Sequence, residues 1–134
     1  MGKFSDQIKS RTEVYNRRAR AIARTAIQTT VNDMMTPVSD GGRLRVDTGF
    51  MLNSGGAALN SIPSGPSEKG ESGTTGEPLP IVLLKWKPGD TVVFGLSASY
   101  ARYRESEDGF VRGAAEKWQG NVRDAVRDAK ARIR

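Results

Sequence analysis

The chain has 134 residues, no Cys and no His, and 21 Lys and Arg against 15 Asp and Glu, which gives a formal net charge of +6. The missing Cys excludes disulfides, thiolate nucleophiles and Cys-based metal centres. The missing His excludes a Ser-His-Asp triad and removes the commonest general base and metal ligand. The length suits a single domain, 1–134, that can bury its own core.

The basic surplus lies at the two ends of the chain. Residues 1–35 carry seven Lys and Arg against three acidic residues, and residues 100–134 carry nine against six. This permits a nucleic-acid or anionic protein partner without requiring one. No segment approaches the roughly 20 apolar residues of a membrane span, and the first residues lack the apolar core of a signal peptide. We therefore expect the mature protein to be the whole chain, made in the cytosol.

Residues 4–35 have apolar side chains at spacings of three, four and seven, which predicts one long amphipathic helix. Ser5 and Asp6 are candidates for its N-terminal cap, and Pro37 is expected to end it. At 1.5 Å per residue such a helix is about 45 Å long. A single small domain cannot cover that length, so the helix is expected either to kink or to pack on another molecule.

The middle of the chain alternates between turns and short β-rich runs. A turn is predicted over 37–43, then a short helical turn capped by Asp47 or Thr48 and ended by Gly55-Gly56, then a strand within 57–62. Residues 61–80 are rich in Gly, Ser, Thr and Pro and are predicted to form a long flexible arm. Residues 81–87 and 91–96 are predicted to pair as an antiparallel hairpin around 88–90.

From Tyr100 the helical pattern returns and continues to the end of the chain. Phe110 and Trp118 lie on its apolar stripe and are predicted to be core residues, and Trp86 is predicted to be a core or interface residue rather than a ligand stacker. Together these elements predict an α+β fold. It consists of a long N-terminal helix, a small antiparallel sheet with a loop arm, and a C-terminal amphipathic helix packed on the sheet.

Few residues suggest chemistry. No phosphate-binding loop or serine-nucleophile motif is present. Glu105, Glu107 and Asp108 could hold a divalent ion with Asp47 or Asp90, but no ligand spacing supports this, and carboxylates in the first turn of a helix are the simpler interpretation. We expect no enzyme activity, catalytic residue, metal, cofactor or small-molecule substrate.

An arginine cluster on the first helix could contact DNA phosphates or an acidic partner, or could form a solvated helix face. Its members are Arg17, Arg18, Arg20 and Arg24.

Three segments in order resemble the tail-completion and neck proteins of tailed phages. The first is Val46-Asp47-Thr48-Gly49-Phe50-Met51-Leu52-Asn53-Ser54. The second, Ser99-Tyr100-Ala101-Arg102-Tyr103-Arg104-Glu105, follows an apolar strand as in that family. The third begins Gly109-Phe110-Val111-Arg112-Gly113 and runs to Trp118, resembling the opening of the family's last helix. The Gly/Ser/Pro-rich insertion, and Ser106-Glu107-Asp108 before the last helix, depart from the family pattern.

The resemblance implies a virion structural protein of the head–tail junction, made in the host bacterial cytoplasm. Such proteins form a ring, commonly of six copies, that terminates the tail tube and joins it to the head connector, with DNA passing through the lumen. The expected partners are other copies of the chain, head-completion or connector proteins and the tail-tube protein. Asp47, Thr48 and Gly49 would set a tight turn, Tyr100, Tyr103 and Glu105 would fix the start of the last helix, and the 61–80 arm would reach a neighbour. A small basic protein that binds nucleic acid non-specifically is the alternative.

Overall fold

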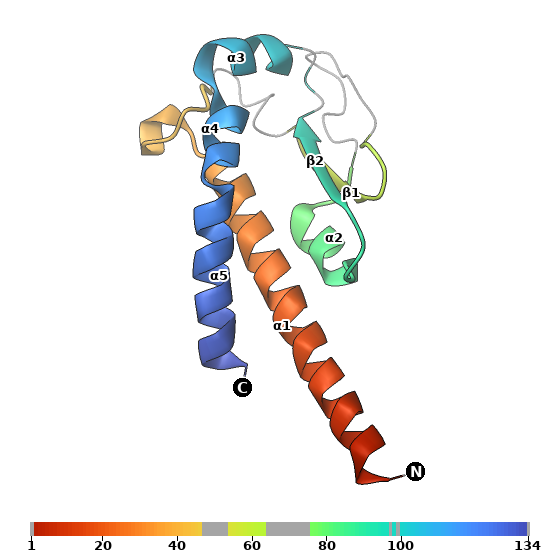
Figure 1. Cartoon of the computed structure of the whole chain (residues 1–134). Coiled ribbons are helices and arrows are strands. Elements are labelled where there is room, and N and C mark those ends of the chain that lie inside the picture. The colour runs from red at the N-terminus through yellow and green to blue at the C-terminus, as the bar shows by residue number, and fades with distance from the viewer. Residues whose placement is uncertain (1, 47–53, 64–75, 97, 99, 134) are drawn as a thin grey trace.

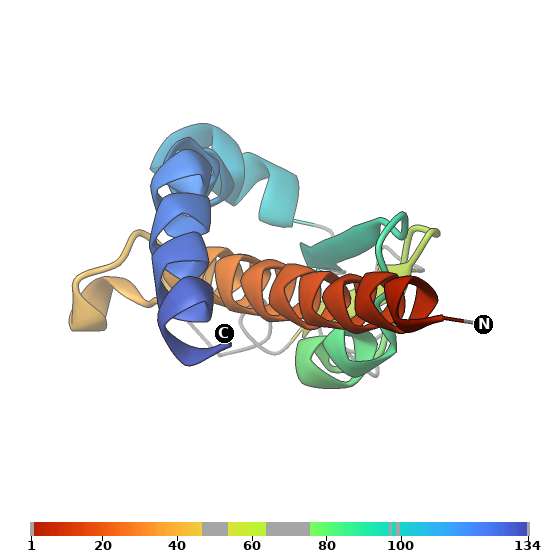
Figure 2. The same ribbon diagram turned by 60° about the horizontal axis from the view of Figure 1, so that its bottom comes forward.

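The computed structural model describes residues 2–46, 54–63, 76–96, 98 and 100–133. Within these ranges the elements follow the predicted α+β class. They are α1 (Lys3–Met34), the 3₁₀ turn η1 (Val38–Asp40), β1 (Gly55–Leu59), α2 (Leu79–Lys85), β2 (Val92–Leu96), α3 (Ala101–Asp108), α4 (Phe110–Glu116) and α5 (Trp118–Arg132). The helix α1 runs through the molecule, with α5 along one side and α2 with the sheet on the other (Figures 1 and 2).

The first helix is confirmed almost to the residue. Its 32 residues contain no Gly or Pro, so nothing interrupts the backbone hydrogen bonds. It begins at Lys3, two residues before Ser5, with Gly2 as the N-cap, so the expected capping role of Ser5 and Asp6 is wrong. It ends at Met34, two residues before the restriction that Pro37 imposes on Thr36.

The predicted strand at 81–87 is wrong, because this segment forms the helix α2. Its buried side chains, Leu79, Val82 and Leu83, follow the spacing of a helix, and Pro80 lies in the first turn, where a missing N–H costs nothing. The C-terminal end of α2 is held by Arg24, which donates from Nε to the Leu83 carbonyl at 2.9 Å and from Nη2 to that of Leu84 at 3.3 Å.

The sheet is antiparallel, but its strands come from distant parts of the chain. Strand β2 pairs with β1 in a register that sets Gly55 opposite Leu96 and Leu59 opposite Val92. Gly55 and Gly56 open strand β1. Ser54, just before them, has a 3₁₀-helical conformation, and the rest of the predicted helical turn lies outside the described residues. The turn predicted at 88–90 is present, with Gly89 at φ +101°, but it joins α2 to β2. Glu77, in the predicted arm, bridges to Ala57 on the other edge of β1.

The expected C-terminal helix consists of three pieces. Gly109 adopts φ +64° between α3 and α4, and Lys117 separates α4 from α5. The last two pieces pack along α1, and α4 also reaches the sheet, because Phe110 and Ala114 share a buried cluster with Phe94 and Leu96. A second cluster joins α2 to β1, and Val31 and Phe94 adjoin both clusters.

Candidate functional site

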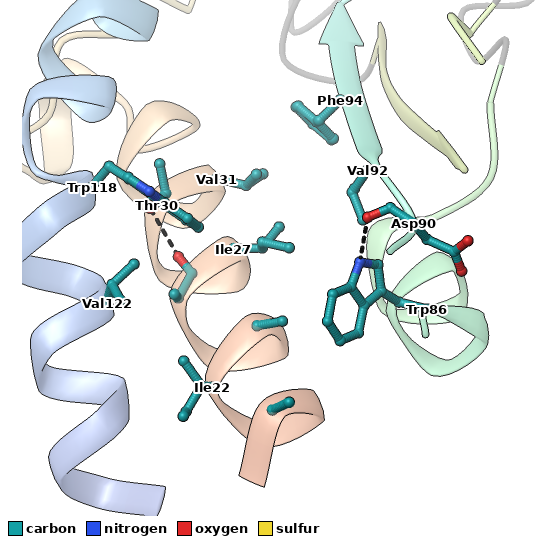
Figure 3. Close-up of a pocket in the computed structure, with 13 residues that line it drawn as sticks. Ile22, Ile27, Thr30, Val31, Trp86, Asp90, Val92, Phe94, Trp118 and Val122 are labelled. Atoms are coloured by element: carbon teal, nitrogen blue, oxygen red, sulfur yellow. Dashed lines mark hydrogen bonds between the residues drawn. The ribbon is translucent and has the colours of Figure 1, made fainter. Parts of the chain in front are cut away.

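Among the described residues, an apolar groove runs along α1, and we call it the α1 groove. It has a volume of about 670 Å³ and lies between α5 and the segment from Trp86 to Phe94 (Figure 3). Its floor consists of small and branched side chains of α1, chiefly Ala19, Ile22, Ala23, Ala26 and Ile27. Trp118 and Val122 form one wall, and Trp86, Val92 and Phe94 form the other.

The groove depends on small residues of α1 between two larger walls. Ala26 is almost completely buried, so α5 approaches α1 closely there, with Ala125 and Ala129 buried on the facing side. The helix α5 lies on one side of α1, and α2 with β2 lies on the other (Figure 1). The indole N–H of Trp86 donates to the Asp90 carbonyl at 2.9 Å, which fixes the ring at the groove edge.

The groove is suited to hydrophobic contact rather than proton transfer. Its one titratable lining residue is Asp90, whose carboxylate accepts hydrogen bonds from Asn60 Nδ2 at 3.2 Å and from the Lys87 backbone N–H at 3.0 Å. This carboxylate lies on the side away from α1 (Figure 3). The inner surface therefore offers aliphatic and indole groups to an apolar occupant.

A second exposed feature is the N-terminal half of α1, residues 3–17, which we call the projecting segment. It extends beyond the C-terminal end of α5 (Figure 1). That end lies beside Arg18 of α1, whose Nε donates a hydrogen bond to the Ile133 carbonyl at 2.8 Å. Every residue from 2 to 13 is exposed. Phe4, Ile8 and Tyr15 are 74%, 50% and 75% exposed, although they belong to the apolar stripe of the helix.

Motif residues of the second and third segments meet at the corner between α3 and α4. Glu105 accepts hydrogen bonds on its carboxylate from the backbone N–H of Val111 at 2.7 Å and of Arg112 at 3.1 Å. Gly109 supplies the left-handed turn, and Phe110 is buried in the core as predicted. Glu105 thus caps the helix that follows it, which is the role the resemblance implies for it.

The remaining predicted motif residues have mixed outcomes. Asp47, Thr48, Gly49 and Leu52 lie outside the described residues, and Ser54 is fully buried just before β1. Tyr100 is the N-cap residue of α3 and Ala101 begins that helix. Tyr103 is 75% exposed, so no packing within the chain supports a role for it at the helix start.

Two other expectations are changed by tertiary contacts. Trp118 was expected in the core, but it is 41% exposed at the groove wall. Glu107 and Asp108 lie in the last turn of α3 and not in the first turn of a helix. The side chain of Asp108 is nearly buried, and its Oδ1 lies 3.1 Å from Arg45 Nε. Among the residues that the structure describes, no three acidic side chains gather in a way that could hold a metal ion.

The predicted arginine cluster is divided by the fold. Arg18 donates to the Ile133 carbonyl just after α5, and Arg24 donates to the Leu83 carbonyl in α2, so both hold the fold together. Arg17 and Arg20 are exposed and remain available to a partner. Sequence reasoning could not separate the two pairs, because the carbonyls they meet are 59 to 115 residues away.

Comparison with models of known protein families, with curated proteins and with solved structures finds no match to this chain. In the described part of the chain, no helix combines the length and the apolar character needed to cross a membrane.

Proposed function

We propose that this chain is a structural protein of a tailed phage or phage-like particle, and that it forms a ring at the head–tail junction. In this role it terminates the tail tube and joins it to the head connector, and DNA passes through the lumen. It acts by geometry and not by catalysis, through contacts between copies that close into a ring. Its place in the mature particle is the neck or the adjoining end of the tail.

The observation that carries the proposal is that α1 exposes apolar side chains along its N-terminal half and an open apolar groove along its C-terminal half. A side chain such as Phe4 or Ile8 gains about 1.5–3 kcal/mol when it is fully buried. In the isolated chain these side chains stay in water while an apolar groove stands open on the same helix. Both features are what a subunit of an assembly needs, because an assembly buries them.

The ordered resemblance motifs add independent support for the particular assembly. Glu105, Gly109 and Phe110 form one structural unit, in which a carboxylate, a left-handed glycine and a buried ring together set the direction of α4. The net charge of +6 suits a ring whose lumen carries DNA, because exposed cations reduce the repulsion that the phosphates would meet from a neutral or acidic wall.

The experiment is to determine the mass of the purified full-length chain and to image it by electron microscopy, alone and mixed with isolated tail tubes. We expect closed rings, or a monomer that closes into rings on the tube ends. A protein that stays monomeric and never joins tubes or capsids would refute the proposal.

The alternative, a small nucleic-acid-binding protein, is tested by titrating DNA at several salt concentrations. A ring subunit should bind weakly and without sequence preference, whereas a dedicated binder should show sub-micromolar affinity with a steep salt dependence. If the alternative holds, replacing Arg17 and Arg20 by Ala should flatten the salt dependence, by a slope of about 1 per lost phosphate contact.

A further inference from the structure

The exposed apolar stripe of the projecting segment and the floor of the α1 groove lie on the same face of one helix. Successive residues of a helix are rotated by about 100°, so Phe4, Ile8 and Tyr15 fall within an arc of roughly 40°. Ile22, in the groove floor, falls within the same arc. The stripe is therefore continuous, but only its C-terminal half is flanked by walls.

We propose that the α1 groove binds the projecting segment, residues 3–17, of a second copy of this chain. The inference deepens the proposed function and rests on it, because it names the contact by which neighbouring copies join. Each copy has one segment to give and one groove to fill, whether the segments are passed around a ring or exchanged within a pair. The binding mode is an amphipathic helix laid into an apolar groove, with anchors near one face of the helix.

The groove and the segment match in chemistry. The inner surface of the groove carries no charged group, since the Asp90 carboxylate is bonded on the outer side (Figure 3). On the segment, Asp6 and Glu13 lie on the face opposite Phe4, so they stay in water when the stripe is buried. Arg11 lies at the edge of the stripe, and its apolar stem can lie along the groove while its guanidinium reaches solvent.

The area involved is what favours a second copy as the occupant. An aromatic side chain buries about 150–250 Å², so Phe4 and Tyr15, with Ile8, remove on the order of 400 Å² from water when they dock. The groove that receives them, with the half-buried Trp86 and Trp118, loses a smaller area. Two copies that exchange their segments thus bury on the order of 1,000 Å² in total, the lower bound for a specific interface.

Crosslinking tests the contact directly, because the native chain contains no Cys. Two single-Cys variants, Ile8→Cys on the stripe and Val122→Cys on the groove wall, are mixed, allowed to exchange and treated with a short bismaleimide. We expect a covalent dimer that contains one copy of each variant. Glu13→Cys, on the opposite face of the same helix, is the matched control and should give little or no product with Val122→Cys.

A second measurement uses side chains that the fold does not need. Phe4→Ser with Ile8→Ser should leave the far-UV circular dichroism of the chain unchanged, since both residues are exposed, and should weaken self-association at least about 100-fold. Dissociation should also shift the tryptophan emission to longer wavelength, because both tryptophans line the groove.

The outcomes separate this inference from the proposed function. Assemblies that form on tail tubes without the Ile8–Val122 crosslink, and that survive the double Ser substitution, would overturn the inference and leave the proposed function standing. A chain that neither self-associates nor joins tail tubes would overturn both. The mixed crosslink in a protein that never joins tubes would support the docking contact alone.

Discussion

Replacing Gly109 by Ala tests whether the corner between α3 and α4 depends on a left-handed residue. Gly109 has φ +64° and ψ +31°, is buried, and is at once the last cap of α3 and the first cap of α4. An L-residue in this conformation costs about 1–2 kcal/mol. Ala also lowers the entropy of the unfolded chain, which returns about 0.4–1 kcal/mol, so the net loss should be about 1 kcal/mol.

Steric contact changes this estimate little. A Cβ at Gly109 would lie 3.1 Å from Arg112 Nη2 and 3.7 Å from Arg43 Nη1, and both are the ends of flexible side chains that can move aside. The matched control is Gly120→Ala inside α5, where a Cβ would meet no atom within 4 Å. Gly120 is the third residue of α5, and Ala at this helical position should stabilise the protein by about 0.5–1 kcal/mol.

The assay is urea unfolding followed by far-UV circular dichroism, with the wild-type chain and both variants at one protein concentration. The two variants should move the midpoint in opposite directions, with a difference in unfolding free energy of about 1.5–2 kcal/mol. Equal stability of the two variants, or a Gly109→Ala protein more stable than wild type, would refute the argument from backbone conformation.

The remaining predictions are checked with the same urea assay. Glu105→Ala should lower the free energy of unfolding by about 0.5–2 kcal/mol, because two backbone N–H groups lose their acceptor. Glu107→Ala loses only an exposed ion pair with Arg104 at 3.4 Å and should cost less than about 0.5 kcal/mol. Equal losses in the two variants would contradict the capping role of Glu105. Phe110→Ala should cost about 3–5 kcal/mol, since the ring is buried, and a loss below 1 kcal/mol would mean that the cluster it joins is not a core. Asn60→Ala should cost about 1–3 kcal/mol, because it removes the hydrogen bonds to Asp90 and to the Thr91 N–H and places Ala at φ +58°. Asn60→Gly also loses these hydrogen bonds but relieves the backbone strain, so it should recover part of that loss.

The sequence was sufficient for elements with a sustained local pattern. The 3.6-residue period over more than eight turns predicted α1, and Pro37 marked the end of its run, because both signals act within a few residues. The burial of Phe110 followed from its place on a helical stripe in the same way. The length of α1 was also predicted, and with it the expectation that the helix either kinks or packs on another molecule; the structure has one uninterrupted helix.

The local sequence did not decide whether a short apolar run forms a strand or a helix. Residues 81–87 have the composition of a strand, and a run of this length fits a buried strand or a buried helix equally well. The helix prevails because Leu79, Val82 and Leu83 can then pack together against Ala57, and because Arg24 caps its end from α1. Once this segment is helical, β2 must pair with a distant strand, which only the folded chain supplies.

What the sequence alone determined is the fold class, the long first helix and its apolar stripe, since these depend on composition and local periodicity. Only the tertiary structure decided which parts of that stripe are covered. The helix α5 ends beside Arg18, so the stripe is walled over one half and bare over the other. A repeating pattern shows which face of a helix is apolar, but the length and position of its neighbours set where that face still meets water.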